Sequence, residues 1–432
     1  MARKLSRRSF LKSTATAAVA APYVVPPSAL GRDGPPAPSN RITMGCIGVG
    51  GMGSGNLGSF LGQSDCRVLA VCDVDRNHLN NARNRINDHY KNTDCAAYDD
   101  FRKLVARTDV DAISLATPDH WHAIPAVAAA KSGKDIYGEK PFSHTHAEGV
   151  AMVEAIQRYG RIWQTGSWQR SQNNFRFACE LVRNGCIGKV HTVEVGLPSG
   201  STDPASVGRP TTPSTPPEHL DYDFWVGPSP ALPYIPARSV FHWRWHLDFG
   251  GGQLMDWIGH HNDIAHWGLG LDYSGPVEVE GTGDFLDSPV WNHATKYKVT
   301  CKYKGGLTTY LGSGHHYRGG TRWIGEDGWV HVNRGHLSAK PMSLLETEFG
   351  PNDIHLFRSP GHHRDFLDCV KSRKPTLTPA EVAHRSATPG HLGHVAMTLG
   401  RKLEWDPKTE KIIGDPEASR MLGTAMRSPW RL

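Results

Sequence analysis

The chain has 432 residues and a formal net charge of +6, and this length is enough for two domains with separate hydrophobic cores. Five of the basic residues lie close to the N-terminus: Arg3, Lys4, Arg7, Arg8 and Lys12. Without them the body of the chain is nearly neutral, which excludes an electrostatic argument for nucleic-acid binding.

The first feature in chain order is a targeting segment. "SRRSFLKS" (residues 6–13) followed by the apolar run "STATAAVAAPYVV" is typical of a twin-arginine signal, which exports folded proteins across the bacterial inner membrane. The run is too short, and too interrupted by proline, for a secure membrane span of about 20 residues. We therefore expect residues 1–40 to be a twin-arginine signal and Pro-rich linker, a periplasmic location, and no stable membrane span unless the signal stays uncleaved. A basic tail with an accidental arginine pair is the alternative.

Residues 42–62, "ITMGCIGVGGMGSGNLGSFLG", predict an apolar strand, a glycine turn and the start of a helix. The turn fits G-x-G-x-x-G, in which the first glycine permits a tight turn, the second lets the backbone approach a pyrophosphate, and the third lets helix pack on strand. The turn residues that we expect to contact a dinucleotide are Gly48, Gly50, Gly51, Met52 and Gly53.

A second apolar strand, "RVLAVCDVD", ends near Asp73, which lies where a ribose hydroxyl needs an acceptor. A carboxylate at this point repels a 2′-phosphate and favours NAD as the cofactor. Arg76 lies close enough to keep NADP open.

Helices and strands then alternate through the first half of the chain. Helices are predicted at 77–90, 123–133 and 145–160, and strands at 111–117, 135–139 and 161–167. This pattern predicts an α/β fold whose N-terminal domain, residues 41–162, is a Rossmann domain with a doubly wound parallel sheet. Ligands of such sheets lie at the carboxyl ends of the strands, here in "TPDHWH" (117–122) and "EKPFSHTH" (139–146).

The pattern changes after residue 162. Segments 191–198, 277–285 and 296–314 alternate polar with apolar residues, and 329–335 is a further predicted strand. Such strands predict an open, mostly antiparallel sheet with helices on one side. We expect residues 163–432 to be an α+β domain for substrate binding and oligomerisation, with a C-terminal helical tail. The Pro/Ser/Thr-rich stretch 198–219 predicts a surface loop.

Cysteine usage bears on the redox state of the chain. Eight cysteines in an exported protein would normally suggest disulfides. Cys46 and Cys72 fall in apolar runs typical of buried strands, and a twin-arginine substrate folds first in the reducing cytoplasm. We expect mostly free, packed cysteines.

Four features in order resemble the Gfo/Idh/MocA oxidoreductase family, named for glucose-fructose oxidoreductase and inositol dehydrogenase. They are the glycine turn with Asp73, "ATPDHWH", "GEKP", and "GGGQLMDWIGHHND" (residues 250–263). The resemblance covers nearly the whole chain after residue 41. It implies an NAD(P)-dependent oxidoreductase that acts on the CH–OH group of a sugar or sugar derivative.

The resemblance places Lys140 of "EKP" beside the nicotinamide and the reacting hydroxyl. An ammonium can hydrogen-bond a developing oxyanion and exchange a proton. By the same resemblance Thr117, Pro118, His122 and Glu139 line the cofactor cleft. A core or capping histidine is the alternative for His122.

Asp256 and His260 are four residues apart on a predicted helix and project from one face. The resemblance makes His260 a general base, with Asp256 orienting its ring or contacting substrate. A structural Asp–His bond is one alternative. A metal site is another, with His261 as a candidate ligand, although we predict none. Its remaining ligands would come from His315, His316, His362 and His363.

Several aromatic and basic residues fall on segments that resemble pocket-lining ones. Aromatic faces stack on the C–H faces of a sugar, while basic groups bind hydroxyls or an acidic group. The residues that we expect to contact substrate are Trp168, Arg170, Arg244, His246 and His260. Core packing is the alternative for each residue taken singly.

Export constrains the reaction, because the periplasm offers no dependable pool of nicotinamide. We therefore expect the cofactor to be loaded before export, tightly held, and recycled by returning hydride to carbon on the same protein. An alternative reaction is NAD-dependent glycoside cleavage by oxidation, elimination, hydration and re-reduction. A noncatalytic ligand-binding protein is a third hypothesis. On resemblance alone we expect a homodimer or homotetramer.

Overall fold

The computed structural model describes residues 36–432. The predicted export signal lies outside the described residues, so its prediction stays open. In the N-terminal unit, Met1–Arg41, the described part holds the single 3-10 turn η2 (Pro38–Asn40). Among the described residues no helix is long and apolar enough to span a membrane.

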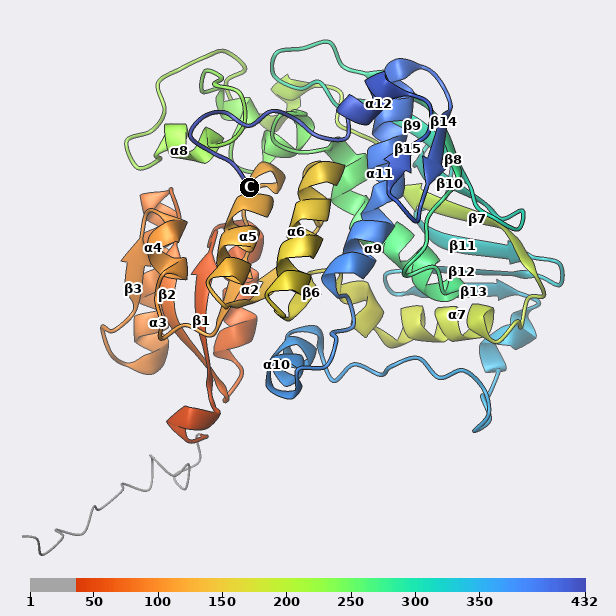
Figure 1. Cartoon of the computed structure of the whole chain (residues 1–432), viewed down its shortest axis with the longest axis horizontal. Helices are drawn as coiled ribbons and strands as arrows, with labels where there is room; N and C mark the ends of the chain where they lie inside the picture. The colour runs from red at the N-terminus through yellow and green to blue at the C-terminus, as the bar shows by residue number, and fades with distance from the viewer. Residues whose placement is uncertain (1–35) are drawn as a thin grey trace, which may run out of the picture. The chain divides into compact units, whose positions relative to one another are not determined.

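The first sheet has six parallel strands in the order β3-β2-β1-β4-β5-β6, coloured red to yellow in Figure 1. Its strands are β1 (Ile42–Ile47), β2 (Cys66–Cys72), β3 (Ala96–Tyr98), β4 (Ala112–Leu115), β5 (Asp135–Gly138) and β6 (Trp163–Thr165). The connecting helices are α2 (Gly51–Leu61), α3 (Arg76–Tyr90), α4 (Phe101–Val105), α5 (Ala123–Lys131) and α6 (His146–Arg158). Apolar residues of α2 and α3 form one core cluster, and those of α4, α5 and α6 form another. The predicted doubly wound Rossmann domain is confirmed.

The second sheet has nine strands in the order β13-β12-β11-β7-β10-β9-β8-β14-β15. They are β7 (Val190–Leu197), β8 (Glu278–Phe285), β9 (Ala294–Lys302), β10 (Thr308–Ser313), β11 (Gly320–Gly325), β12 (Trp329–Asn333), β13 (His336–Lys340), β14 (Leu403–Asp406) and β15 (Lys411–Ile412). Strands β7 and β10 pair in parallel, and the other paired neighbours are antiparallel. This confirms the predicted mostly antiparallel sheet.

Long helices bury the inner face of the second sheet. The helices of this region are α7 (Asn173–Arg183), α8 (Tyr222–Val226), α9 (Gly252–Leu269), α10 (His362–Ser372), α11 (Ala380–Leu399) and α12 (Pro416–Arg420). Helices α7, α9 and α11 contact the strands, and α11 also contacts α6 of the first domain. The absence of side chains at Gly390 and Gly393 lets α11 approach Ile258 of α9 and Val299 of β9 closely. Figure 1 shows α9 and α11 lying between the two sheets.

The predicted boundary between the domains is wrong by a few residues. Strand β6, which the boundary at 162 assigns to the second domain, pairs with β5 in the first sheet. The chain also returns to the first domain late in the sequence, because Phe366 of α10 packs on Phe60 and Tyr137. A boundary drawn along the sequence cannot represent this return.

All eight cysteines are free thiols, and seven are buried while Cys186 is partly exposed. This confirms the prediction that they are packed and unpaired. Burial raises the pKa of the Cys66 thiol to about 12, which makes it unreactive as a nucleophile at neutral pH.

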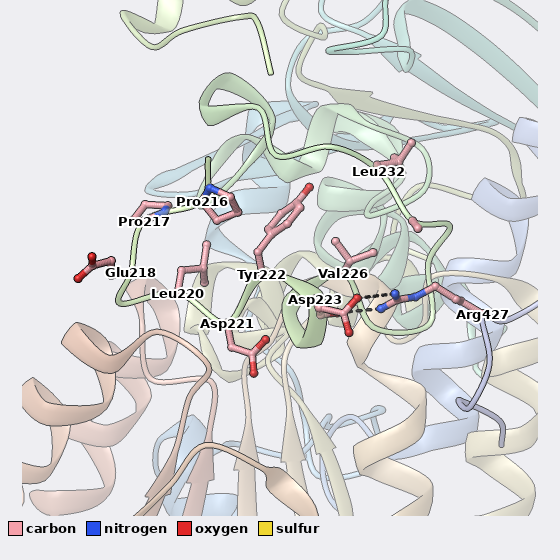
Figure 2. A pocket seen from close by; sticks show the side chains of 11 residues that line it. Pro216, Pro217, Glu218, Leu220, Asp221, Tyr222, Asp223, Val226, Leu232 and Arg427 are labelled. Atoms are coloured by element: carbon pink, nitrogen blue, oxygen red, sulfur yellow. Dashed lines mark hydrogen bonds and ion pairs between the residues drawn. The ribbon is translucent and has the colours of Figure 1, made fainter. Parts of the chain in front are cut away.

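The segment predicted as a surface loop, residues 198–219, lies between β7 and α8 and does more than connect them. Its end and the three residues that follow, together residues 216–222, cross the first domain just after β2, and we call them the strap. Leu220 forms an antiparallel bridge with Asp75, and the backbone N–H of Asp221 donates to the carbonyl of Val74 at 3.0 Å. A cavity of about 470 Å³ borders the strap (Figure 2) and is closed on one side by Arg427, which pairs with Asp223. No residue predicted for the site lines this cavity.

Candidate active site

The glycine turn between β1 and α2 has the geometry that the motif predicts. Gly48 has φ +75°, and a Cβ atom there would lie 2.6 Å from the carbonyl oxygen of Ala116. A Cβ atom on Gly53 would lie 1.9 Å from the carbonyl oxygen of Gly48, so helix and strand can pack only with glycine at this position. Gly51 faces open space, and no side chain caps the N-terminus of α2. The uncapped N–H groups of this turn suit a pyrophosphate.

Asp73 at the end of β2 is held in place by backbone N–H groups. Its two carboxylate oxygens accept from Val49 and Asp75 at 2.8 and 2.9 Å, and each keeps a lone pair for a ribose hydroxyl. Arg76, the residue that kept NADP open, donates to the carbonyl of Glu218 in the strap. The geometry at this point favours NAD.

The segment after β4 reaches the same cleft. The side-chain oxygen of Thr117 is buried and has no hydrogen-bond partner among residues 36–432, so it is available to a bound cofactor. His122 is different, since its ring nitrogens lie 2.8 Å from the carbonyl of Pro141 and 3.0 Å from that of Thr117. His122 is only 2% exposed, and burial lowers its pKa to about 4. The prediction that His122 contacts the cofactor is therefore corrected: it is a core residue that joins the two loops.

Glu139 also needs correction. Its carboxylate is buried and accepts from Asn56 of α2 at 2.9 Å, and a Cβ atom on Gly166 would touch both of its oxygens. The side chain therefore holds α2 to the end of β5 instead of facing a ligand. Sequence position alone could not distinguish it from Lys140, its neighbour.

Lys140 follows β5, and the Lys140–Pro141 peptide bond is cis. Its Nζ donates to the carboxylate of Asp256 at 2.7 Å and to the carbonyl of the same residue at 2.9 Å. Gly259 lets α9 come this close, because a Cβ atom there would lie 3.2 Å from that of Lys140. An ammonium has three N–H groups, so one remains for an oxygen of a ligand.

Asp256 is the centre of the charged cluster. Arg244 also donates to it, at 3.3 Å, and the guanidinium lies 4.4 Å from the ring centres of Phe241 and Trp243. Burial alone would raise the pKa of Asp256, but the charges of Lys140 and Arg244 outweigh it and hold the pKa below its ordinary value. The carboxylate is therefore ionised at neutral pH and binds the ammonium of Lys140 as an ion pair.

His260 lies one turn beyond Asp256 on α9, but the two side chains are not bonded. The carboxylate of Asp256 is engaged by Lys140 and Arg244, and Nδ1 of His260 is buried without a partner. This corrects the prediction that Asp256 orients the ring. Burial, together with the charges of Lys140 and Arg334, lowers the pKa of His260 well below its ordinary value. The imidazole is therefore neutral and able to accept a proton.

Aromatic rings surround His260. Trp168 lies edge-on with ring centres 6.5 Å apart, and Trp257 lies at 5.4 Å. Trp168 was predicted to contact substrate, and the structure places it beside His260. Arg334, whose guanidinium lies 4.6 Å from the ring centres of both tryptophans, was not predicted. It lies in a tight hairpin turn, where the sequence gives only a turn signal at Gly335.

Two predicted substrate residues lie elsewhere. Arg170 is 2% exposed and is bound by Asp263 at 2.7 Å and Asp272 at 2.9 Å, so it is a buried structural ion pair and the prediction is wrong. His246 lies in the turn before α9, where Nδ1 is 3.6 Å from the carboxylate of Asp248. Burial lowers its pKa to about 4. Its contacts are with that turn, which corrects its assignment to substrate.

The histidines of the metal alternative are not gathered in one place. His315 bonds Ser199, His362 bonds Ser171, and His363 bonds Asn56. The described residues do hold another group with metal-like spacing: His146, His384 and Glu410. There His384 and Arg385 bind the carboxylate of Glu410 at 2.9 and 3.3 Å, which already satisfies it as an ion pair.

Comparison with known proteins identifies the family of the chain. A family model described as "Oxidoreductase family, NAD-binding Rossmann fold" matches residues 42–167, and one described as "Oxidoreductase family, C-terminal alpha/beta domain" matches residues 173–432. The chain belongs to the Gfo/Idh/MocA oxidoreductase family. Its N-terminal domain is accordingly an NAD-binding domain, which agrees with the glycine turn, Asp73 and the unpartnered hydroxyl of Thr117.

Curated relatives match parts of the chain. A 2,7-anhydro-N-acetylneuraminate hydratase of Mediterraneibacter gnavus is 30% identical over 152 residues, which is 34% of this chain and 38% of the relative. A glycosyl hydrolase family 109 protein of Saccharopolyspora erythraea is 33% identical over 153 residues, 34% of this chain and 33% of the relative. A myo-inositol 2-dehydrogenase of Thermotoga maritima is 29% identical over 164 residues, 38% of this chain and 46% of the relative. Each match covers less than half of the relative's length.

Solved structures share the fold over most of the chain. An aldose-aldose oxidoreductase from Caulobacter crescentus superposes with a TM-score of 0.62 at 19% identity, covering 84% of this chain and 99% of that one. The WlbA dehydrogenase from Bordetella pertussis superposes with a TM-score of 0.60 at 16% identity, covering 85% and 99%. Both domains therefore follow the fold of known members.

Proposed function

We propose that this protein is an NAD-dependent oxidoreductase that oxidises a CH–OH group of a sugar or sugar derivative. The observation that carries the proposal is the 2.7 Å ion pair between Lys140 and Asp256. Asp256 lies on α9, the helix that also carries His260, the proposed neutral base. Lys140 follows β5, at the carboxyl end of the NAD-binding sheet, where ligands of such folds bind.

The residues divide the chemistry between them. NAD, when bound, accepts the hydride. The free N–H of Lys140 donates to the substrate oxygen and stabilises the negative charge that develops on it. His260 takes the hydroxyl proton, because its neutral imidazole has an unpartnered nitrogen. Asp256 positions Lys140 through the ion pair.

We further propose that the cofactor is retained and recycled on the protein. The strap supports this, because its backbone is bonded to residues 74–76, immediately after the ribose acceptor Asp73. A segment in this place restricts release of the adenosine end. Retention suits the proposed export by the twin-arginine pathway to the periplasm, where free nicotinamide is scarce.

NAD-dependent glycoside cleavage is the second candidate. The names of two relatives, a hydratase of an anhydro-sugar and a glycosyl hydrolase family 109 protein, favour it. The same His260 could remove the acidic C–H beside a transient carbonyl, after which elimination, hydration and re-reduction leave NAD unchanged. Both candidates use one oxidation step and one site.

We also propose that the chain forms a homodimer or homotetramer through the open face of the second sheet. That face carries Lys298 over Tyr310 and Arg322 over Trp329. Amphipathic pairs of this kind suit a partly polar interface. Light scattering of the purified protein measures the mass directly.

The first test is to purify the protein without added nucleotide, denature it, and identify released nucleotide by mass spectrometry. Near-stoichiometric NAD supports the proposal and directs a screen of sugars and glycosides for redox-neutral conversion. Absence of nucleotide with weak binding of added NAD would contradict it and favour a ligand-binding protein. Release of stoichiometric NADH during turnover would contradict recycling alone.

A further inference from the structure

Arg334 is a charged residue that the proposed chemistry does not use. It lies in the two-residue turn between β12 and β13, where Asn333 pairs with His336. The turn is tied down, because the carbonyl of Asn333 accepts from Asn174 at 2.9 Å and its side-chain amide donates to Gly319 at 3.0 Å. These hydrogen bonds hold the backbone of the turn that carries the Arg334 side chain.

Two tryptophans position the guanidinium. It lies 4.6 Å from the ring centres of Trp168 and Trp257, and these rings come from η4 (Trp168–Ser171) and from α9. A guanidinium stacked on aromatic faces keeps the edge that carries its N–H groups free. That edge can bind a carboxylate with two parallel hydrogen bonds.

Arg334 is exposed, and the carboxylate of Asp256 acts on its charge only from a distance, since Lys140 and Arg244 bind that carboxylate. Among residues 36–432, no Asp or Glu carboxylate lies within the 4.0 Å that defines an ion pair with Arg334. By contrast, Arg322 lies 4.6 Å from the ring of Trp329 in the same sheet and is paired with Glu194 at 3.4 Å. Arg322 shows that a stacked arginine of this sheet can also bind a carboxylate, whereas the exposed guanidinium of Arg334 is free to bind one from a ligand.

The position of Arg334 connects it with the reacting group. Both tryptophans that carry it also pack on His260, at 6.5 and 5.4 Å between ring centres. A ligand whose hydroxyl meets His260 and Lys140 would present a neighbouring substituent toward Arg334. An anionic substituent there would accept charge-assisted hydrogen bonds from the guanidinium.

We propose that Arg334 is a specificity residue that binds a carboxylate of the substrate, so that the enzyme acts on an acidic sugar such as a uronic acid. The inference rests on the proposed function, because it assigns the substrate class of that same site. A carboxylate is favoured over a phosphate because Arg334 offers one planar fork and a single charge, which match a planar monoanion.

The test uses the full-length protein with the nucleotide with which it purifies. Binding is measured by calorimetry for glucuronate, galacturonate and mannuronate, and for glucose, galactose and mannose as neutral counterparts. The variants are Arg334→Gln, which removes the charge, Arg334→Lys, which keeps it without the fork, and Arg322→Gln as a matched control. Tryptophan fluorescence follows each titration, since Trp168 and Trp257 flank the proposed contact.

We expect at least one uronate to bind ten-fold or more tightly than its neutral hexose. Arg334→Gln should remove this preference, Arg334→Lys should keep a weakened one, and Arg322→Gln should leave it unchanged. No preference for any uronate, survival of the preference in Arg334→Gln, or tighter binding of glucose 6-phosphate than of every uronate would each overturn the proposal. NAD content, measured on the same samples, reports the proposed function separately from this preference.

Discussion

Lys140 and Asp256 are 116 positions apart in the sequence, and their side chains meet at 2.7 Å. Lys140 lies two residues beyond β5 of the NAD-binding domain, and Asp256 lies on α9 of the second domain. The ion pair therefore joins the two domains at the proposed active site, where the ammonium can donate to a substrate oxygen.

Substitution of either partner should reduce turnover strongly. Lys140→Met removes the donor to the substrate oxygen, and Asp256→Asn removes the charged partner that positions Lys140, so we expect kcat to fall by about 100-fold or more in each. Steady-state kinetics on a substrate found in the sugar screen measures the loss. Full kcat in Asp256→Asn, with an unchanged urea midpoint, would show that the ion pair is not part of the chemistry.

The sequence predicted much of this arrangement because its signals are local. The glycine turn requires a particular backbone at Gly48 and Gly53, and apolar strand and helix patterns repeat with short periods, so most elements of the first domain could be predicted. The short elements β3 and α4 were not predicted. Lys140 and His260 came from a family resemblance in short motifs. Those predictions needed no knowledge of which segments meet in space.

The wrong predictions concern side chains whose partners are distant in the sequence. Asp256 and His260 share a helix face, but the sequence does not show that Lys140 approaches from another domain and takes the carboxylate. Arg170 reads as a free basic group until Asp263, 93 positions away, is seen to neutralise it. Arg334 is hidden in an ordinary hairpin turn. In each case the partner is distant in sequence.

Gly53 should tolerate no side chain, whereas Gly51 should. A Cβ atom at Gly53 would lie 1.9 Å from the carbonyl oxygen of Gly48, but one at Gly51 would have no neighbour within 4 Å. We expect Gly53→Ala to lower the free energy of unfolding by about 1–3 kcal/mol or more, as overpacking does. Gly51→Ala should stay within about 0.5 kcal/mol. Urea unfolding of both variants decides this, and equal effects would refute the packing role.

The Arg170 ion pair should matter for stability. Arg170→Met leaves Asp263 and Asp272 without their buried counter-ion, which costs about 3–5 kcal/mol. Exposed Arg401, which pairs with Asp415 at 2.9 Å, is the matched control, and Arg401→Met should lower the stability far less than Arg170→Met. A stable Arg170→Met variant that had lost only substrate affinity would restore the original assignment.

Acid should destabilise the fold through its buried neutral histidines. Burial lowers the pKa of His122 to about 4, while the unfolded chain takes up a proton near 6.5. The folded state therefore keeps its full stability above about pH 6.5 and loses it as the pH falls toward 4. At pH 5 the loss from His122 is about 2 kcal/mol.

Urea unfolding at pH 7 and pH 5 measures this dependence. In His122→Gln the difference between the two pH values should shrink by about 2 kcal/mol relative to the parent, while His89→Gln, at an exposed position, should leave it unchanged. An identical pH dependence in His122→Gln would mean that His122 does not stay neutral in the fold.

The strap should slow the dissociation of NAD. The backbone N–H of Asp221 donates to the carbonyl of Val74, and the Asp221 side chain caps α8 by accepting from Phe224. Asp221→Ala removes only the cap, whereas Asp221→Pro removes the backbone donor as well, and proline fits the φ of −74° at this position. A difference between the two variants therefore isolates the hydrogen bond that fastens the strap beside the ribose site.

We expect Asp221→Pro to release NAD at least ten-fold faster in a chase with excess labelled NAD, and Asp221→Ala to release it at the parental rate. If both variants exchange at the parental rate, the strap does not retain the cofactor, and retention must come from contacts within the cleft itself.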